Sequence, residues 1–202
     1  ISNGVGTVTS SAASLTVNPR SIFGASFGTF GGDGGTFSLL PPAPVTSIAH
    51  GINDAGTIIG STFEDPLPTR GFILSGGAYT YFMRPGWTHS HGRAISASGL
   101  VTGYSEDVTG TAFSGFIYNP VTGAFTDISI PGSGLTIAQG INNAGQVVGS
   151  AILADGAHAF LRQNDGTIVL FRIGGNPTRA RGISDTGLMT GFVTIGAVTS
   201  GF

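Results

Sequence analysis

The chain has 202 residues, and its 8 Lys+Arg and 10 Asp+Glu give a formal net charge of −2 at pH 7. Charged residues make up 9% of the chain, where about 25% is usual in a soluble domain, and 35 residues are glycine. These figures exclude a basic nucleic-acid surface, the lack of cysteine excludes disulfides and thiol chemistry, and no apolar run is long enough for a membrane-spanning helix.

The first 18 residues form a segment of their own. Asn3-Gly4-Val5-Gly6 and the stretch Ser10-Ser11-Ala12-Ala13-Ser14-Leu15-Thr16-Val17 together resemble the last hairpin of a bacterial immunoglobulin-like domain. A lone hairpin is marginal in water, so residues 1–18 are either the tail of an immunoglobulin-like domain whose remainder lies upstream, or a segment for which two other hypotheses are open. The segment is either a flexible linker, or a strand that adds itself to a sheet edge of another copy through the apolar side chains of Val5, Val8, Leu15 and Val17. Strand addition of the second kind does not close and predicts filaments.

Residues 19–23 are interpreted as a linker to a repeat domain at residues 24–202. A ten-residue motif recurs there, for example Gly140-Ile141-Asn142-Asn143-Ala144-Gly145-Gln146-Val147-Val148-Gly149. Its isoleucine recurs every 42–46 residues, at Ile52, Ile95, Ile141 and Ile183. A second motif follows each copy and carries Phe72, Phe116, Phe160 and Phe202.

The ten-residue motif predicts a tight β-hairpin, because Asn and Gly are the residues that such turns require. Its second glycine either ends the returning strand or lets a neighbouring backbone approach closely. The phenylalanine motif begins a third strand, and a further turn and β-rich run, as in Thr167-Ile168-Val169-Leu170-Phe171, supply a fourth. No window has a helical period, so we expect an all-β fold, and a repeat of this length with four strands is typical of a β-propeller blade.

The repeat begins and ends out of phase, with a half-unit at each end. Thr36 precedes Ile52 by the same 16 residues that separate Thr167 from Ile183, so residues 24–45 correspond to the second half of a unit. The N- and C-terminal half-blades could pair and close a ring of about four blades, which would protect the edge strands. The alternative is an open piece of a longer array.

The recurring hairpin motif followed by His158-Ala159-Phe160-Leu161 resembles the bacterial extracellular repeats of the HAF family. The other units carry Arg-Gly-Phe or Ser-Gly-Phe at that place. The resemblance implies a secreted or surface-exposed, propeller-like protein. It carries no catalytic motif to transfer.

Candidate binding residues concentrate in the first complete unit. Exposed aromatic rings can stack on sugars, which makes Tyr79, Tyr81 and Trp87 candidates for ligand binding. His89 and His91 alternate along a predicted strand, so both imidazoles lie on one side of it. Without a cysteine or a clear carboxylate ligand nearby, this pair predicts a polar loop rather than a metal site. We expect no catalytic residues and no cofactor.

These observations favour a non-enzymatic extracellular structural or adhesive protein that assembles with copies of itself, into a filament or surface layer. The low charge supports association, because a surface this poor in charge is prone to it. A carbohydrate-binding, lectin-like propeller is the alternative, and glycans O-linked to Ser or Thr are a further expected partner. A secreted hydrolase using Glu64 or Glu106 ranks third.

Overall fold

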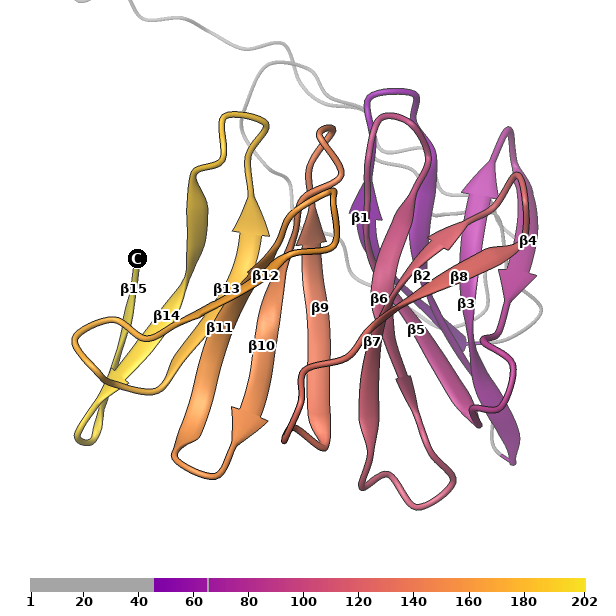
Figure 1. Cartoon of the computed structure of the whole chain (residues 1–202). Coiled ribbons are helices and arrows are strands. Elements are labelled where there is room, and N and C mark those ends of the chain that lie inside the picture. Colours follow the sequence, from indigo (N-terminus) through magenta and orange to yellow (C-terminus); the bar gives the residue numbers. More distant parts are fainter. Residues whose placement is uncertain (1–45, 65) are drawn as a thin grey trace, which may run out of the picture. The chain divides into compact units, whose positions relative to one another are not determined.

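The computed structural model describes residues 46–64 and 66–202, and this part of the chain folds as one unit. It contains 15 strands and no helix among the described residues, which confirms the all-β class (Figure 1). No helix with the length and apolarity of a bilayer-crossing segment occurs in the described part. The predictions made for residues 1–18, for the linker at residues 19–23 and for the half-unit at residues 24–45 fall outside the described residues.

The strands form repeated antiparallel units, as predicted for β-propeller blades. The first unit comprises β1 (Thr46–Ile52), β2 (Ile58–Glu64), β3 (Leu67–Ser75) and β4 (Ala78–Phe82). The second comprises β5 (His89–Ile95), β6 (Val101–Glu106), β7 (Phe113–Asn119) and β8 (Ala124–Ile128). The third comprises β9 (Leu135–Ile141), β10 (Val147–Leu153), β11 (Gly156–Arg162) and β12 (Ile168–Phe171). The fourth comprises β13 (Thr178–Ile183), β14 (Met189–Ile195) and β15 (Val198–Gly201).

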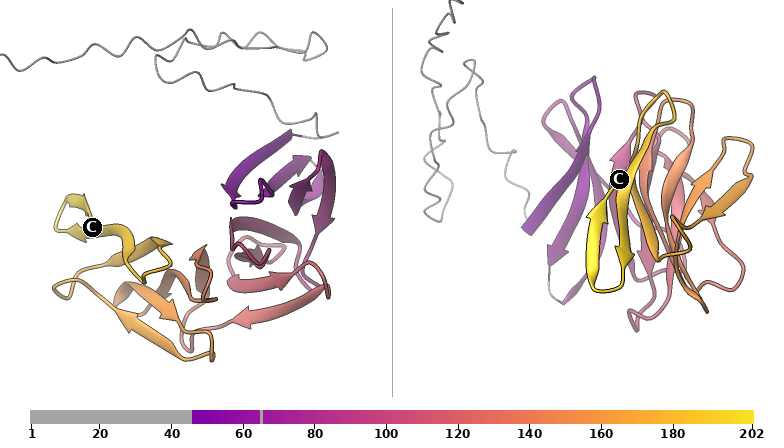
Figure 2. Two further views of the ribbon diagram at one scale, coloured as in Figure 1. Left: turned by 90° about the horizontal axis from the view of Figure 1, so that it is seen from above. Right: turned by 90° about the vertical axis from the view of Figure 1, so that its left-hand side faces the viewer.

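Within each unit the strands pair in chain order, and the units follow one another along this part of the chain (Figure 2). A single parallel pair, Phe113 with Leu135, links the second and third units into one sheet, supported by a hydrogen bond from the Phe113 N–H to the Gly134 carbonyl at 2.9 Å. The first strands β1, β5, β9 and β13 contact one another from unit to unit. We call these four the inner strands.

The hydrophobic core lies between neighbouring units. One cluster joins Ile59 and Phe82 of the first unit to Ile95 and Phe116 of the second. A second cluster joins Ile128 of the second unit to residues of the third, among them Phe160. Three of the repeated phenylalanines, Phe72, Phe116 and Phe160, are 0% exposed.

The hairpin turns of neighbouring units are joined by hydrogen bonds. In the third unit, Asn142 Oδ1 accepts from the Gln146 N–H at 2.9 Å, and Gly145 has a φ of 77° that favours glycine. The amide of Asn142 also donates to the Ser184 carbonyl of the fourth unit at 3.0 Å. Asn53 of the first unit likewise donates to the Ser96 carbonyl of the second at 3.1 Å.

Asparagine and serine therefore alternate at this turn position from unit to unit. Ser96 and Ser184 close their own turns through Oγ, which accepts from the N–H of Leu100 and of Leu188. The serine side chain has no amide group that could donate to the turn of the next unit. Between the second and third units, the Ala97 N–H instead donates to Asn143 Oδ1 at 2.6 Å. The repeat thus has a longer period of two units.

The second glycine of the motif lies within a strand, where neighbouring backbone approaches closely. A Cβ atom on Gly149 of β10 would overlap the carbonyl oxygen of Ile137 and lie 2.8 Å from the Phe160 ring. The inner strand bulges beside it, because Ala138 pairs with Gly149 and Gly140 pairs with Val148, which leaves Gln139 without a partner. The same overlap recurs in the other units, at Gly60, Gly103 and Gly191. Close approach, rather than strand termination, therefore explains this glycine.

Candidate binding site on the inner strands

A β-bulge places a polar residue at the same position of all four inner strands. The register of each inner strand against its neighbour skips one residue opposite the second glycine of the motif. Bulges re-aim side chains and are common beside functional sites. The skipped residues are His50, Arg93, Gln139 and Arg181.

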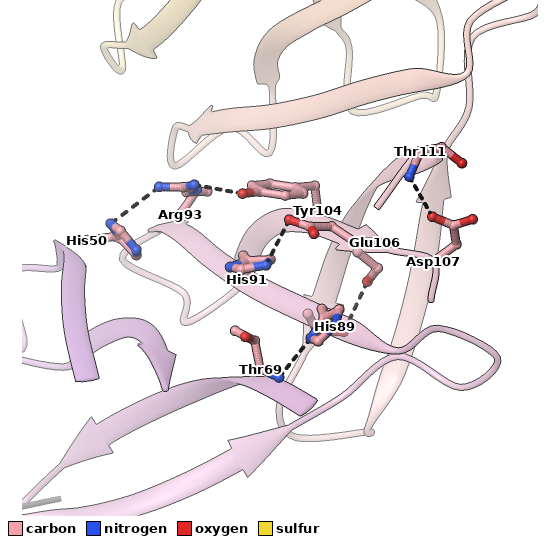
Figure 3. A network of polar contacts seen from close by, with 11 residues as sticks. His50, Thr69, His89, His91, Arg93, Tyr104, Glu106, Asp107 and Thr111 are labelled. Carbon is pink, nitrogen blue, oxygen red and sulfur yellow. Dashed lines mark hydrogen bonds and ion pairs between the residues drawn. The ribbon is translucent and has the colours of Figure 1, made fainter. Parts of the chain in front are cut away.

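In the first and second units these bulges bring His50 and Arg93 together (Figure 3). Nη1 of Arg93 lies 3.4 Å from Nδ1 of His50, and Nη2 donates to the Tyr104 hydroxyl at 2.9 Å. The guanidinium also lies over the Tyr104 ring, 5.1 Å from its centroid. Burial first, and the positive charge of Arg93 second, lower the pKa of His50. Arg93 is therefore the main positive charge of this cluster at neutral pH.

His91 is buried beneath this cluster. Its ring stacks on Tyr104, with centroids 4.6 Å apart and planes inclined by 15°. Burial, followed by the charges of Arg93, His89 and His50, lowers the pKa of His91 to about 4. The imidazole is thus neutral at pH 7, and its Nε2, 3.1 Å from a carboxylate oxygen of Glu106, makes no ion pair there.

We expect this neutral, buried histidine to make the fold less stable in weak acid. The unfolded chain takes up a proton on His91 near pH 6.5, whereas the folded chain does so only near pH 4, so stability is lost as the pH falls through this window. From pH 7 to pH 5 the free energy of unfolding should fall by about 2 kcal/mol on account of His91. Urea unfolding at both pH values measures it.

The His91→Gln variant should lose this part of the pH dependence. His158→Gln is the matched control. His158 lies half-buried on β11, outside this cluster, and its Nε2 is 3.5 Å from a carboxylate oxygen of Asp155. An unchanged pH dependence in His91→Gln would contradict the assignment.

The fourth unit repeats the arginine–aromatic pair of the second. Arg181 lies over the Phe192 ring, 5.4 Å from its centroid, and it is exposed. Phe192 and Tyr104 each directly follow the second glycine of their motif, whereas Ser61 and Ser150 take this place in the first and third units. The two-unit period of the turns therefore extends to the inner strands.

The aromatic candidates are half-buried and belong to two groups. Tyr79 and Tyr81 of β4 stack on each other, with centroids 6.1 Å apart and nearly parallel rings, and the guanidinium of Arg70 lies over Tyr81. Trp87 lies instead in the connection to the second unit, beneath Arg84. Arg84 is buried and pairs with Asp127 at 2.6 Å, so Trp87 belongs to the junction between units.

The two histidine candidates lie in one region but contact different partners. Nδ1 of His89 accepts a hydrogen bond from the Thr69 N–H at 2.9 Å, while His91 contacts Tyr104 and Glu106 (Figure 3). Among the described residues, no group of three or more His, Cys, Asp or Glu side chains could hold a metal ion. Neighbouring Asp107 caps its own loop, accepting from the N–H groups of Thr111 and Ala112.

Sequence reasoning missed the bulge residues, although a signal was present. Each stands two positions before the repeated isoleucine, and that position is polar in all four units. The aromatic residue after the second glycine, in alternate units, is a second signal.

Fold and site together define a β-propeller-type repeat protein with polar bulges on its inner strands. Among solved structures, selenomethionine-substituted virginiamycin B lyase from Staphylococcus aureus is similar, with a TM-score of 0.45 and 15% sequence identity over 81% of this chain and 57% of that one. The chain thus spans little more than half of that structure's length. No protein-family profile and no curated protein matches the chain.

Proposed function

We propose that this chain belongs to a non-enzymatic extracellular protein of the HAF type, with a structural or adhesive role, that assembles by association of its repeat ends. The extracellular location and the HAF assignment rest on the sequence motif around His158-Ala159-Phe160. The assembly rests on one structural observation: the apolar surfaces that join units inside the array are exposed at its first and last described units.

No described residue covers the surface of the first unit that, in the later units, packs against a preceding unit. Ile52 is 65% exposed, whereas Ile95 and Ile141, at the same position of the second and third units, are 8% and 7% exposed. Ile48 of the same strand is 49% exposed. Burying such side chains is worth about 1.5–3 kcal/mol each, so this surface favours association.

The fourth unit exposes the opposite surface. The first five residues of β6 and of β10 are all buried, and these strands contact the inner strand of the following unit. In β14, the equivalent strand, only Val193 is buried. Among the described residues, the fourth unit therefore presents the kind of surface against which a first strand such as β1 packs, and we propose a second copy of this chain as its partner.

Sedimentation velocity over a range of concentrations tests the association. The intact chain should form larger species as concentration rises, and Ile52→Glu should weaken this association at least tenfold. Val121→Glu is the matched control, because Val121 is 90% exposed in a loop of the second unit. A variant that lacks residues 1–18 is measured in the same way, to test assembly through the N-terminal strand.

Each outcome of the experiment is decisive. Loss of association in Ile52→Glu alone supports contact through the repeat ends. Loss on deletion of residues 1–18 alone would overturn that contact and move the assembly to the N-terminal strand. A monomer at every concentration would overturn assembly altogether.

A further inference from the structure

We propose that the bulged arginines of the inner strands, Arg93 and Arg181, bind carboxylate groups of a ligand. The first half-site consists of His50, Arg93 and Tyr104. The second half-site consists of the residues at equivalent positions of the following two units, Gln139, Arg181 and Phe192. The binding proposed here does not depend on the proposed assembly.

Arginine is suited to this role because its planar guanidinium matches a carboxylate with two parallel hydrogen bonds. All eight basic residues counted as Lys+Arg in this chain are arginines. Within the described part of the chain, the arginines that have carboxylate partners, Arg84 and Arg172, lie outside the inner strands. No carboxylate lies within ion-pair distance of Arg93 or Arg181 among the described residues.

The guanidinium of Arg93 retains unused hydrogen-bonding capacity. Of its five N–H donors, the contacts with His50 and Tyr104 engage Nη1 and Nη2, and the buried Nε has no partner among the described residues. Tyr104 and His50 hold the side chain in place, which reduces the entropy lost when a ligand binds. Arg93 is half-buried and Arg181 exposed, so solvent reaches both residues.

The charge of each half-site favours a carboxylate over phosphate. Each half-site has one permanent positive charge, because Gln139 is neutral and burial beside Arg93 keeps His50 largely neutral at pH 7. A carboxylate is a planar monoanion that matches the single guanidinium plane, whereas inorganic phosphate at pH 7 is a tetrahedral ion present as both monoanion and dianion. The net charge of −2 adds no general attraction for polyanions.

The experiment uses NMR signals of the arginine Nε–H groups in the intact chain. Galacturonate and galactose are the probes, because they differ only in the carboxylate, and inorganic phosphate at equal ionic strength is the third. The signals of Arg93 and Arg181, assigned by the loss of each in Arg93→Gln and Arg181→Gln, should shift with galacturonate in a saturable way. The signal of Arg162, on β11 and bonded to the Gln163 carbonyl, should not shift.

Galactose should leave all signals unchanged, and phosphate should shift those of Arg93 and Arg181 at least fivefold less than galacturonate does. Equal shifts with galactose, or equal shifts with phosphate, would overturn the proposal. Shifts confined to Arg162, or none at millimolar galacturonate, would overturn it as well. If a glutamine variant fails to fold, Arg93→Lys or Arg181→Lys supplies the assignment instead, because lysine keeps the charge and the alkyl stem but lacks the Nε–H group.

Discussion

Replacing Phe160 by alanine should lower the free energy of unfolding by about 3–5 kcal/mol, the largest effect that we expect from a single side chain. Phe160 is 0% exposed and packs in the cluster that joins Ile128 of the second unit to Ile141 and Val147 of the third. Removing the ring leaves a cavity between two units that share only one backbone pair. Urea unfolding, followed by circular dichroism and by the fluorescence of Trp87, the single tryptophan, measures the change.

Phe202→Ala is the matched control. Phe202 stands at the equivalent position of the fourth unit but is 37% exposed, so its truncation should cost less than half as much. Measurements at low protein concentration separate this effect from association between copies. Equal losses in the two variants would show that burial between units does not stabilise the fold as argued.

Replacing Gly149 by alanine should destabilise the protein by about 3 kcal/mol, although it adds only one methyl group. That methyl would overlap the carbonyl oxygen of Ile137, which belongs to the backbone of the bulged inner strand and cannot rotate away. The strand pair must therefore separate or lose its bulge. The same unfolding experiment measures the loss.

Gly134→Ala is the matched control for Gly149→Ala. A Cβ atom at Gly134 has no neighbour within 4 Å, and the backbone there does not have a positive φ. We expect a change below about 0.5 kcal/mol, typical of a surface substitution. A tolerated alanine at Gly149 would mean that the close approach of the two backbones is not a requirement of the fold.

The repeat made much of the fold predictable from sequence. Four copies of one motif predicted the hairpins and the third strand that carries the repeated phenylalanine, and Phe116 and Phe160 take equivalent, fully buried positions on those strands. Local patterns of this kind are set by neighbours in the chain.

The inner-strand site was not predictable in the same way. A bulge depends on the register between two strands. The residues next to Arg93 in the sequence therefore do not indicate that the Arg93 side chain is re-aimed. The environment of His91 likewise comes from other strands. Tyr104 of β6 stacks on the His91 ring, and the ring centroid of Phe63 in the first unit lies 6.2 Å from that of His91. Contacts between strands and between units determine both features.

The alternation of Asn53, Ser96, Asn142 and Ser184 has a consequence for the history of the protein. The side-chain amide of each asparagine donates to the serine carbonyl in the turn of the next unit. Removing one inner unit would place two asparagine turns or two serine turns side by side and break this pattern of hydrogen bonds. The smallest piece that can be copied or deleted without such a mismatch is a pair of units. Related arrays should therefore have grown by duplication of pairs, and their lengths should differ by even numbers of blades.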